Sequence, residues 1–120
     1  MNKMQALHHF WSSFGLPAYD GTSVPDVAAL PYITYEAVSD EFGNTVPATA
    51  SLWYRSTSWA DITAKEMQIS DYITRGGLMI RYDDGAMWIQ KASPWAQRMS
   101  DPNDDMVRRI VMNVTIEFMD

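Results

Sequence analysis

The segment 106–119 shows the clearest alternation of apolar and polar positions in the chain. Successive side chains of a β-strand point to opposite faces, so a period of two residues is typical of a strand with one buried face. The segment therefore predicts a long, half-buried antiparallel strand. The residues expected on its buried face are Ile110, Met112, Val114, Ile116 and Phe118.

Two hairpins are predicted before this strand. Residues 32–39 and 46–57 are rich in β-forming residues and flank the turn-forming cluster 40–44. Residues 78–92 contain the second hairpin, because Asp84-Gly85 is a strong signal for a tight turn between alternating runs. On the strand 46–57 the face expected to be buried carries Val46, Ala48, Ala50, Leu52 and Tyr54, whereas Thr49, Ser51, Trp53 and Arg55 lie on the other.

Two further segments have the three-to-four-residue spacing of amphipathic helices. Residues 3–14 form the first, which Gly15 and Pro17 end. Residues 58–77 form the second, with a capping-box-like start at Ser58 and a C-terminal cap at Gly76. The stripes expected to be buried are Met4, Leu7, Trp11 and Phe14 in the first helix, and Trp59, Ile62, Ile69 and Ile73 in the second.

The order of elements is therefore α-β-β-α-β-β-β. Such an order predicts an α+β fold, in which an antiparallel or mixed β-sheet has its helices packed on one face. A length of 120 residues suits one domain that spans residues 1–120.

Residues 92–105 show no clear period, and loops of this length in small domains are usually functional. Tryptophan and arginine are enriched at protein interfaces. We therefore interpret this segment as an assembly loop, in which Trp95 anchors in a neighbouring subunit or in a tube on which the chain assembles, and Arg98 pairs with an acidic group of the partner. Local packing of Trp95 against the sheet is the alternative. The other candidates for an assembly interface are Trp53, Arg55, Trp88 and Pro94.

Composition narrows the function classes. The net charge is −6, which argues against a surface that grips nucleic-acid phosphates. The chain has no cysteine, so it holds neither disulfides nor a thiolate metal site. No apolar run reaches the length of a membrane span, and no membrane association is expected.

No catalytic residue, metal ligand or cofactor site is predicted. Asp101, Asn103 and Asp105 have the spacing of the first half of an EF-hand loop. Met106 and Met112, however, occupy the positions that need glycine and glutamate, so an Asx-type turn is the preferred interpretation. No nucleophile stands beside a base in a recognisable motif. We therefore do not expect an enzyme.

Several stretches together resemble the tail terminator, or tail-completion, proteins of phages with long non-contractile tails. The resemblance covers most of residues 30–119 and lies in the stretches LPYITYEAVSDEFGN, ASLWYRSTSWADITAKEMQISDYI, GGLMIRYDDGAMWIQKASPWAQRMSDPND and VRRIVMNVTIEFM. It implies an α+β fold and a hexameric ring on the tail tube, which stops tube polymerisation and joins the tail to the head connector. The implied partners are other copies of the chain, the tail tube protein and the connector or head-closure protein. The implied location is the tail or neck of the virion, and the host cytoplasm during assembly.

The resemblance also implies that DNA passes through the lumen of the ring. Six chains of net charge −6 would carry about −36, and an acidic lumen would let DNA slide without sticking. The candidate lumen residues are the acidic turn tips Asp40, Glu41, Asp83 and Asp84. Within the same class, a head-closure or adaptor protein or a tail tube subunit is the alternative. A small-ligand-binding or enzymatic α+β domain, which would need a concave pocket with polar groups, is the alternative from another class.

Overall fold

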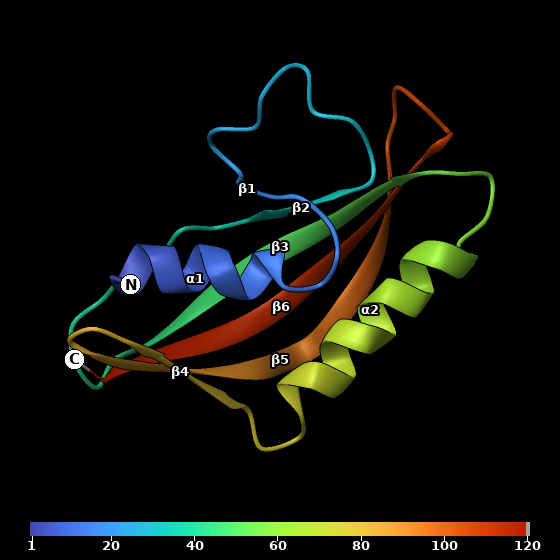
Figure 1. Cartoon of the computed structure of the whole chain (residues 1–120). Coiled ribbons are helices and arrows are strands. Elements are labelled where there is room, and N and C mark those ends of the chain that lie inside the picture. The colour runs from blue at the N-terminus through green and yellow to red at the C-terminus, as the bar shows by residue number, and fades with distance from the viewer. Residues whose placement is uncertain (120) are drawn as a thin grey trace.

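A six-stranded β-sheet carries two helices on one of its faces in the computed structural model, which describes residues 1–119 (Figure 1). The strand order is β1-β2-β3-β6-β5-β4; β1 pairs parallel with β2, and all other neighbours are antiparallel. The predicted α+β fold and the order of the predicted elements are confirmed. In chain order the elements are α1 (Lys3–Ser12), β1 (Ala18–Asp20), β2 (Tyr32–Tyr35), β3 (Thr45–Arg55), α2 (Ala60–Ile73), β4 (Leu78–Tyr82), β5 (Gly85–Ser100) and β6 (Val107–Met119).

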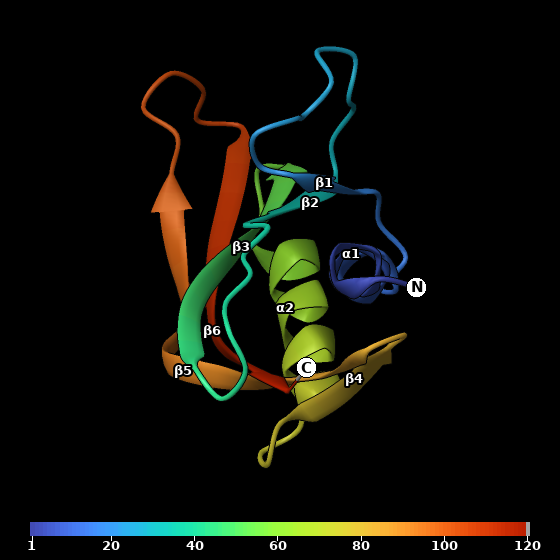
Figure 2. The same cartoon turned by 90° about the vertical axis from the view of Figure 1, so that its left-hand side faces the viewer.

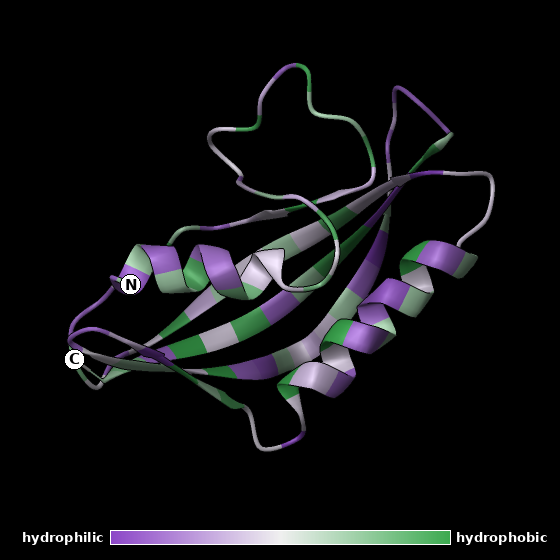
Figure 3. Ribbon diagram, in the orientation of Figure 1, coloured by the Kyte–Doolittle hydropathy of each residue, from purple (hydrophilic) through white to green (hydrophobic). Residues whose placement is uncertain are grey.

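The core lies between the two helices and the inner face of the sheet. The alternation predicted for β6 is confirmed, and Figure 3 shows hydrophobic and hydrophilic bands alternating along this strand. The sheet is strongly curved, so that β4 bends round toward the helices in Figure 2. The buried strand residues include Ile33, Ala48, Ala50, Leu52, Met87, Ile89, Ile110, Met112, Val114, Ile116 and Phe118; the helices bury Ala6, Leu7, Phe10, Trp11, Ile62, Ile69 and Ile73 against them.

The helix ends differ from the prediction. A capping box starts α1: the Asn2 side chain accepts from the backbone of Gln5 at 2.8 Å, and the Gln5 side chain accepts from the backbone of Asn2 at 2.9 Å. Met4, expected to be buried, is exposed, because Ala6 and Phe10 complete the buried face instead. The capping box expected at Ser58 is wrong; the Ser58 hydroxyl accepts from the backbone of Ala60, at the first turn itself.

Three strand predictions also need correction. Strand β1 was not predicted, because three residues carry no readable period and depend on their pairing with β2. Tyr35 ends β2 opposite Ala50, so residues 36–44 form a long connection rather than the tight turn expected at 40–44. The turn of the second hairpin lies at Asp83-Asp84, one residue before the predicted position.

The predicted loop at 92–105 is wrong. Strand β5 continues through it to Ser100, and only residues 101–106 connect β5 to β6. The regular pairing of β5 with β6 is interrupted, however: residues 92–95 form a bulge opposite the single residue Asn113. The side-chain amide of Asn113 donates to the Pro94 carbonyl at 3.0 Å across this bulge. The interruption removes the two-residue period from the sequence, although the chain remains in the sheet.

Trp88 covers a glycine at the start of β4. Gly77 has φ +90°, and a Cβ atom placed there would lie 2.3 Å from Nε1 of Trp88 and 2.9 Å from the Ile89 carbonyl oxygen. The Trp88 Nε1 is buried and has no hydrogen-bond partner among residues 1–119. The absence of a side chain at Gly77 therefore allows the indole to pack directly on the backbone.

We expect Gly77→Ala to lower the free energy of unfolding by about 2 kcal/mol or more, because the new Cβ meets backbone and indole at a positive φ. Gly76→Ala is the matched control: no heavy atom lies within 4 Å of its Cβ, and we expect a change within about 0.5 kcal/mol. Chemical denaturation of both variants measures the difference. Equal stabilities would contradict this account of the Trp88 packing.

Candidate assembly surfaces

Trp95, the proposed anchor of the assembly loop, packs within its own chain. Its ring is partly buried against the core, and its Nε1 donates to a carboxylate oxygen of Glu66 on α2 at 2.7 Å. Lys91 lies over the same ring, 6.0 Å from its centroid, and donates to the Ser70 carbonyl and hydroxyl. These contacts tie the bulge of β5 to α2. The geometry favours the alternative of local packing, while Pro94, in the same bulge, is exposed.

Arg98 is also engaged within the chain. Its guanidinium lies 4.8 Å from the centroid of the Trp59 ring, and Arg108 lies 5.4 Å from the same ring. Arg98 donates to the Thr63 hydroxyl at 3.5 Å, and Arg108 donates to the Thr57 carbonyl at 3.2 Å. The three side chains therefore link the C-terminal end of β5 and the start of β6 to the N-terminal end of α2. Arg98 remains exposed, so its proposed pairing with a partner's acidic group stays a prediction.

The face of the sheet that carries no helix holds a hydrogen-bonded cluster around Trp53. As predicted, Trp53 lies on the face opposite Leu52, and its Nε1 donates to the Thr34 hydroxyl at 2.9 Å. The guanidinium of Arg109 lies 4.5 Å from the centroid of the Trp53 ring, and its Nε donates to the buried Ser51 hydroxyl. Polar groups on this face therefore largely satisfy one another.

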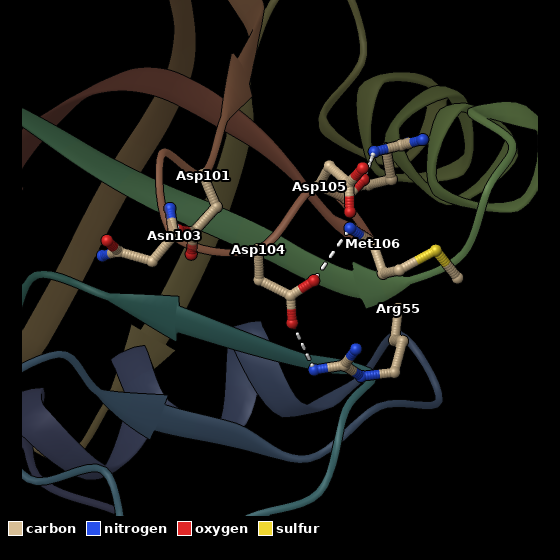
Figure 4. Close-up of polar contacts among 7 residues, drawn as sticks. Arg55, Asp101, Asn103, Asp104, Asp105 and Met106 are labelled. Carbon is tan, nitrogen blue, oxygen red and sulfur yellow. Dashed lines mark hydrogen bonds and ion pairs between the residues drawn. The ribbon is translucent and has the colours of Figure 1, made fainter.

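Arg55 pairs with the connection between β5 and β6 (Figure 4). Its guanidinium lies 2.8 Å from Oδ2 of Asp104, whose Oδ1 accepts from the Met106 backbone at 2.9 Å. These hydrogen bonds, from Met106 first and then from Arg55, lower the pKa of the Asp104 carboxyl. The Asp101 carboxylate accepts from the Asn103 backbone, as in an Asx turn. Within residues 1–119 no group of three or more potential ligands could hold a metal ion.

The structure brings the two acidic turn tips to the same end of the sheet. Both tips lie next to the C-terminal end of β6. The tip with Asp40 and Glu41 precedes β3, whose first residue pairs with Glu117. The tip with Asp83 and Asp84 precedes the start of β5, which pairs with β6 at Met119. The amino group of Met1 lies 2.9 Å from Oδ1 of Asp83. Sequence reasoning named both tips but had no means of placing them together.

The turn at 40–44 also exposes an aromatic ring that the sequence analysis did not single out. Phe42 is 69% exposed. Hydrogen bonds hold the turn: Gly43 N donates to the Phe118 carbonyl at 2.7 Å, and Asn44 N donates to the Glu41 carbonyl at 3.2 Å. The sequence did contain a signal for this exposed ring. Phe42 follows two acidic residues and precedes a Gly-Asn pair, which is a turn-forming sequence, and the side chains of such a turn usually point to solvent.

A hollow of about 260 Å³ lies between α1, α2 and the edge strand β4. Phe10, Tyr72, Leu78 and Met79 supply apolar surface, and His9 and Arg81 add polar groups. On the helix-free face, three shallower hollows of about 520, 310 and 530 Å³ share lining residues and form one trough. Those shared residues are Glu36, Thr49, Tyr32 and Trp53.

One side-chain pair resembles a nucleophile beside a base. Nε2 of His8 lies 3.2 Å from the Ser12 hydroxyl, and Nδ1 lies 3.0 Å from the Tyr35 hydroxyl. The Ser12 hydroxyl, however, donates its one hydrogen to the His8 carbonyl at 2.7 Å. It therefore accepts from Nε2 and does not present a proton for His8 to remove, so the pair lacks the geometry of an activated nucleophile.

No protein-family model matches the sequence, and no curated protein matches it either. Among solved structures, the fold is similar to that of a chain from the virion of a native gene transfer agent particle. The TM-score is 0.62 at 17% sequence identity, and the match covers 95% of this chain and 89% of that chain. At this identity the likeness establishes the fold alone. None of the described helices is long and apolar enough to cross a membrane.

We expect Trp95→Ala to lower the free energy of unfolding by about 2 kcal/mol, because it removes the half-buried indole by which β5 contacts α2. Trp95→Phe should cost about 1 kcal/mol, since it loses mainly the hydrogen bond to Glu66. Met99→Ala, an exposed position at the end of β5, is the control and should change little. Thermal denaturation compares the variants. Unchanged stability of Trp95→Ala together with impaired assembly would instead support the interface-anchor hypothesis.

Proposed function

We propose that this chain is a structural protein of a phage-like virion, and more specifically a ring-forming tail terminator that caps the tail tube and joins it to the head connector. The observation that carries the proposal is the likeness of the fold, over nearly the full length of both chains, to a chain of a gene transfer agent virion. The independent resemblance of residues 30–119 to tail terminator proteins supports the finer assignment. The proposed role needs no catalytic group and no cofactor.

The surface of the chain supports an assembly role. Neighbouring subunits could contact the two ends of the sheet, where the connections 36–44 and 101–106 lie, and its edge strand β4. The proposed partners are further copies of the chain, the tail tube protein and the connector or head-closure protein, and the proposed location is the neck of the virion. A net charge of −6 suits a lumen through which DNA passes without binding.

Tail tubes provide the deciding experiment. The purified chain is added to growing tubes of a tail tube protein from the same source, and tube length and tube ends are recorded by negative-stain electron microscopy. A terminator should stop elongation and leave a ring at one end of each tube. Incorporation along the tube would indicate a tube subunit. Binding to the connector without any effect on tubes would indicate a head-closure or adaptor protein, and indifference to both would contradict the virion assignment.

The acidic end of the sheet yields a second test. Asp84 lies at a turn tip and has no hydrogen bond or ion pair within the described residues, so Asp84→Asn removes charge without breaking a contact. If this tip lines the lumen, assembled Asp84→Asn rings should retain DNA more strongly than wild-type rings at low salt, and the difference should fade as salt rises. Asp71→Asn, on the exposed side of α2, is the charge-matched control. Equal DNA retention by the two variants would show that this tip does not line the lumen.

A further inference from the structure

We propose that Phe42 of one copy inserts into the hollow between α1, α2 and β4 of a second copy, and that Glu41 beside it pairs with Arg81 of that copy. This heterologous contact would link successive subunits of the assembly. It rests on the proposed function only in requiring that the chain assembles with itself, and the contact involves neither a tail tube nor a head.

Phe42 has the properties of an interface anchor. Its ring is 69% exposed, although an aromatic side chain gains from burial and aromatic anchors dominate interface energetics. The turn beneath it is held in place: Asp40 accepts from the Glu41 backbone at 2.7 Å and from the Asn44 amide at 3.2 Å. Gly43 supplies the positive φ of +84° that this turn requires. A ring presented by an ordered turn loses little conformational entropy on binding.

The turn also carries two negative charges next to the ring, on the residues that directly precede Phe42. The hydrogen bonds from the Glu41 backbone and the Asn44 side chain lower the pKa of Asp40, which therefore stays ionised at neutral pH. The carboxylate of Glu41 has no hydrogen bond or ion pair with residues 1–119. An apolar ring that follows two carboxylates in the same turn calls for an apolar site with a cation at its edge.

The hollow beside β4 meets this requirement. Its volume of about 260 Å³ exceeds that of a phenyl ring, and its apolar lining includes Phe10, Tyr72, Leu78 and Met79. Tyr72 and Met79 are 51% and 39% exposed, so apolar surface is open to a partner. None of the described residues that line the hollow carries a carboxylate. Arg81 lines it, and no carboxylate within residues 1–119 pairs with this arginine.

The two surfaces are formed by different parts of the chain. In Figure 2 the turn that precedes β3 lies to the left of β4 and α1, and no residue of 36–44 lines the hollow between α1, α2 and β4. Phe42 therefore does not fill the hollow of its own chain. Two complementary surfaces at different places on one subunit give a head-to-tail contact, which closes into a ring when the rotation between copies permits and otherwise continues as a filament.

Self-association of the full chain tests the contact. Sedimentation velocity over a concentration series should show wild-type species larger than a dimer. We expect Phe42→Ser to weaken association about 30-fold or more, as for loss of an interface anchor, and Arg81→Glu to weaken it about 10-fold or more. The double variant Glu41→Arg/Arg81→Glu should recover most of the association lost by Arg81→Glu alone, because the pair is reversed rather than broken.

A control variant and the melting temperatures distinguish loss of this contact from loss of folding. Val27→Ser is the matched control: Val27 is 91% exposed in the β1–β2 connection and should leave association unchanged. All variants should keep the wild-type melting temperature, since Phe42 and Arg81 are exposed. Wild-type association by Phe42→Ser or Arg81→Glu, or a wild-type chain that never exceeds a dimer, would overturn the contact. A chain that stays monomeric yet caps tail tubes would overturn this contact and leave the proposed function standing.

Discussion

The alternation of side chains along β6 is the constraint on which the rest of the structure depends. This strand pairs with β3 from Val107 to Glu117 and with β5 on its other edge. Its buried side chains belong to the same core as those of both helices, so the register of β6 decides which residues of β3 and β5 face that core. A slip of one residue would turn the whole apolar set of β6 toward solvent. The long connections elsewhere are tolerated because this central register is fixed.

The bulge of β5 adjusts that register where α2 crosses the sheet. Before the bulge, Met87, Ile89 and Lys91 face the helices; after it, Ala96 and Arg98 do so. The change from odd to even positions allows Trp95 to reach Glu66 and Arg98 to reach Thr63. A bulge of this kind bends its strand and re-aims side chains. It thereby joins the second half of β5 to α2 through polar and cation–π contacts rather than through a large apolar core.

The same phase change explains which elements could be predicted from sequence. Strands β3, β4 and β6 and both helices carry readable periods, because one face of each packs against the core; that face is only partly buried in β4. The second half of β5 loses its period at Pro94, and β1 is too short to show one, so both depend on tertiary pairing. The outward position of Trp53 could be predicted from alternation alone. The hollow beside β4 could not, since α1, α2 and β4 create it only when they meet.

The two exposed regions differ in how much each would gain from a partner. On the helix-free face, Arg109 donates to Ser51 and stacks on Trp53, and Trp53 donates to Thr34, so water can cover this face at little cost. Phe42 and the hollow beside β4 instead expose apolar surface, whose removal from water stabilises by about 25 cal/mol per Å². The turn is also ordered before binding, so little of that gain is spent on fixing it. For these reasons the first contact between copies is expected at the aromatic turn and not at the broad face of the sheet.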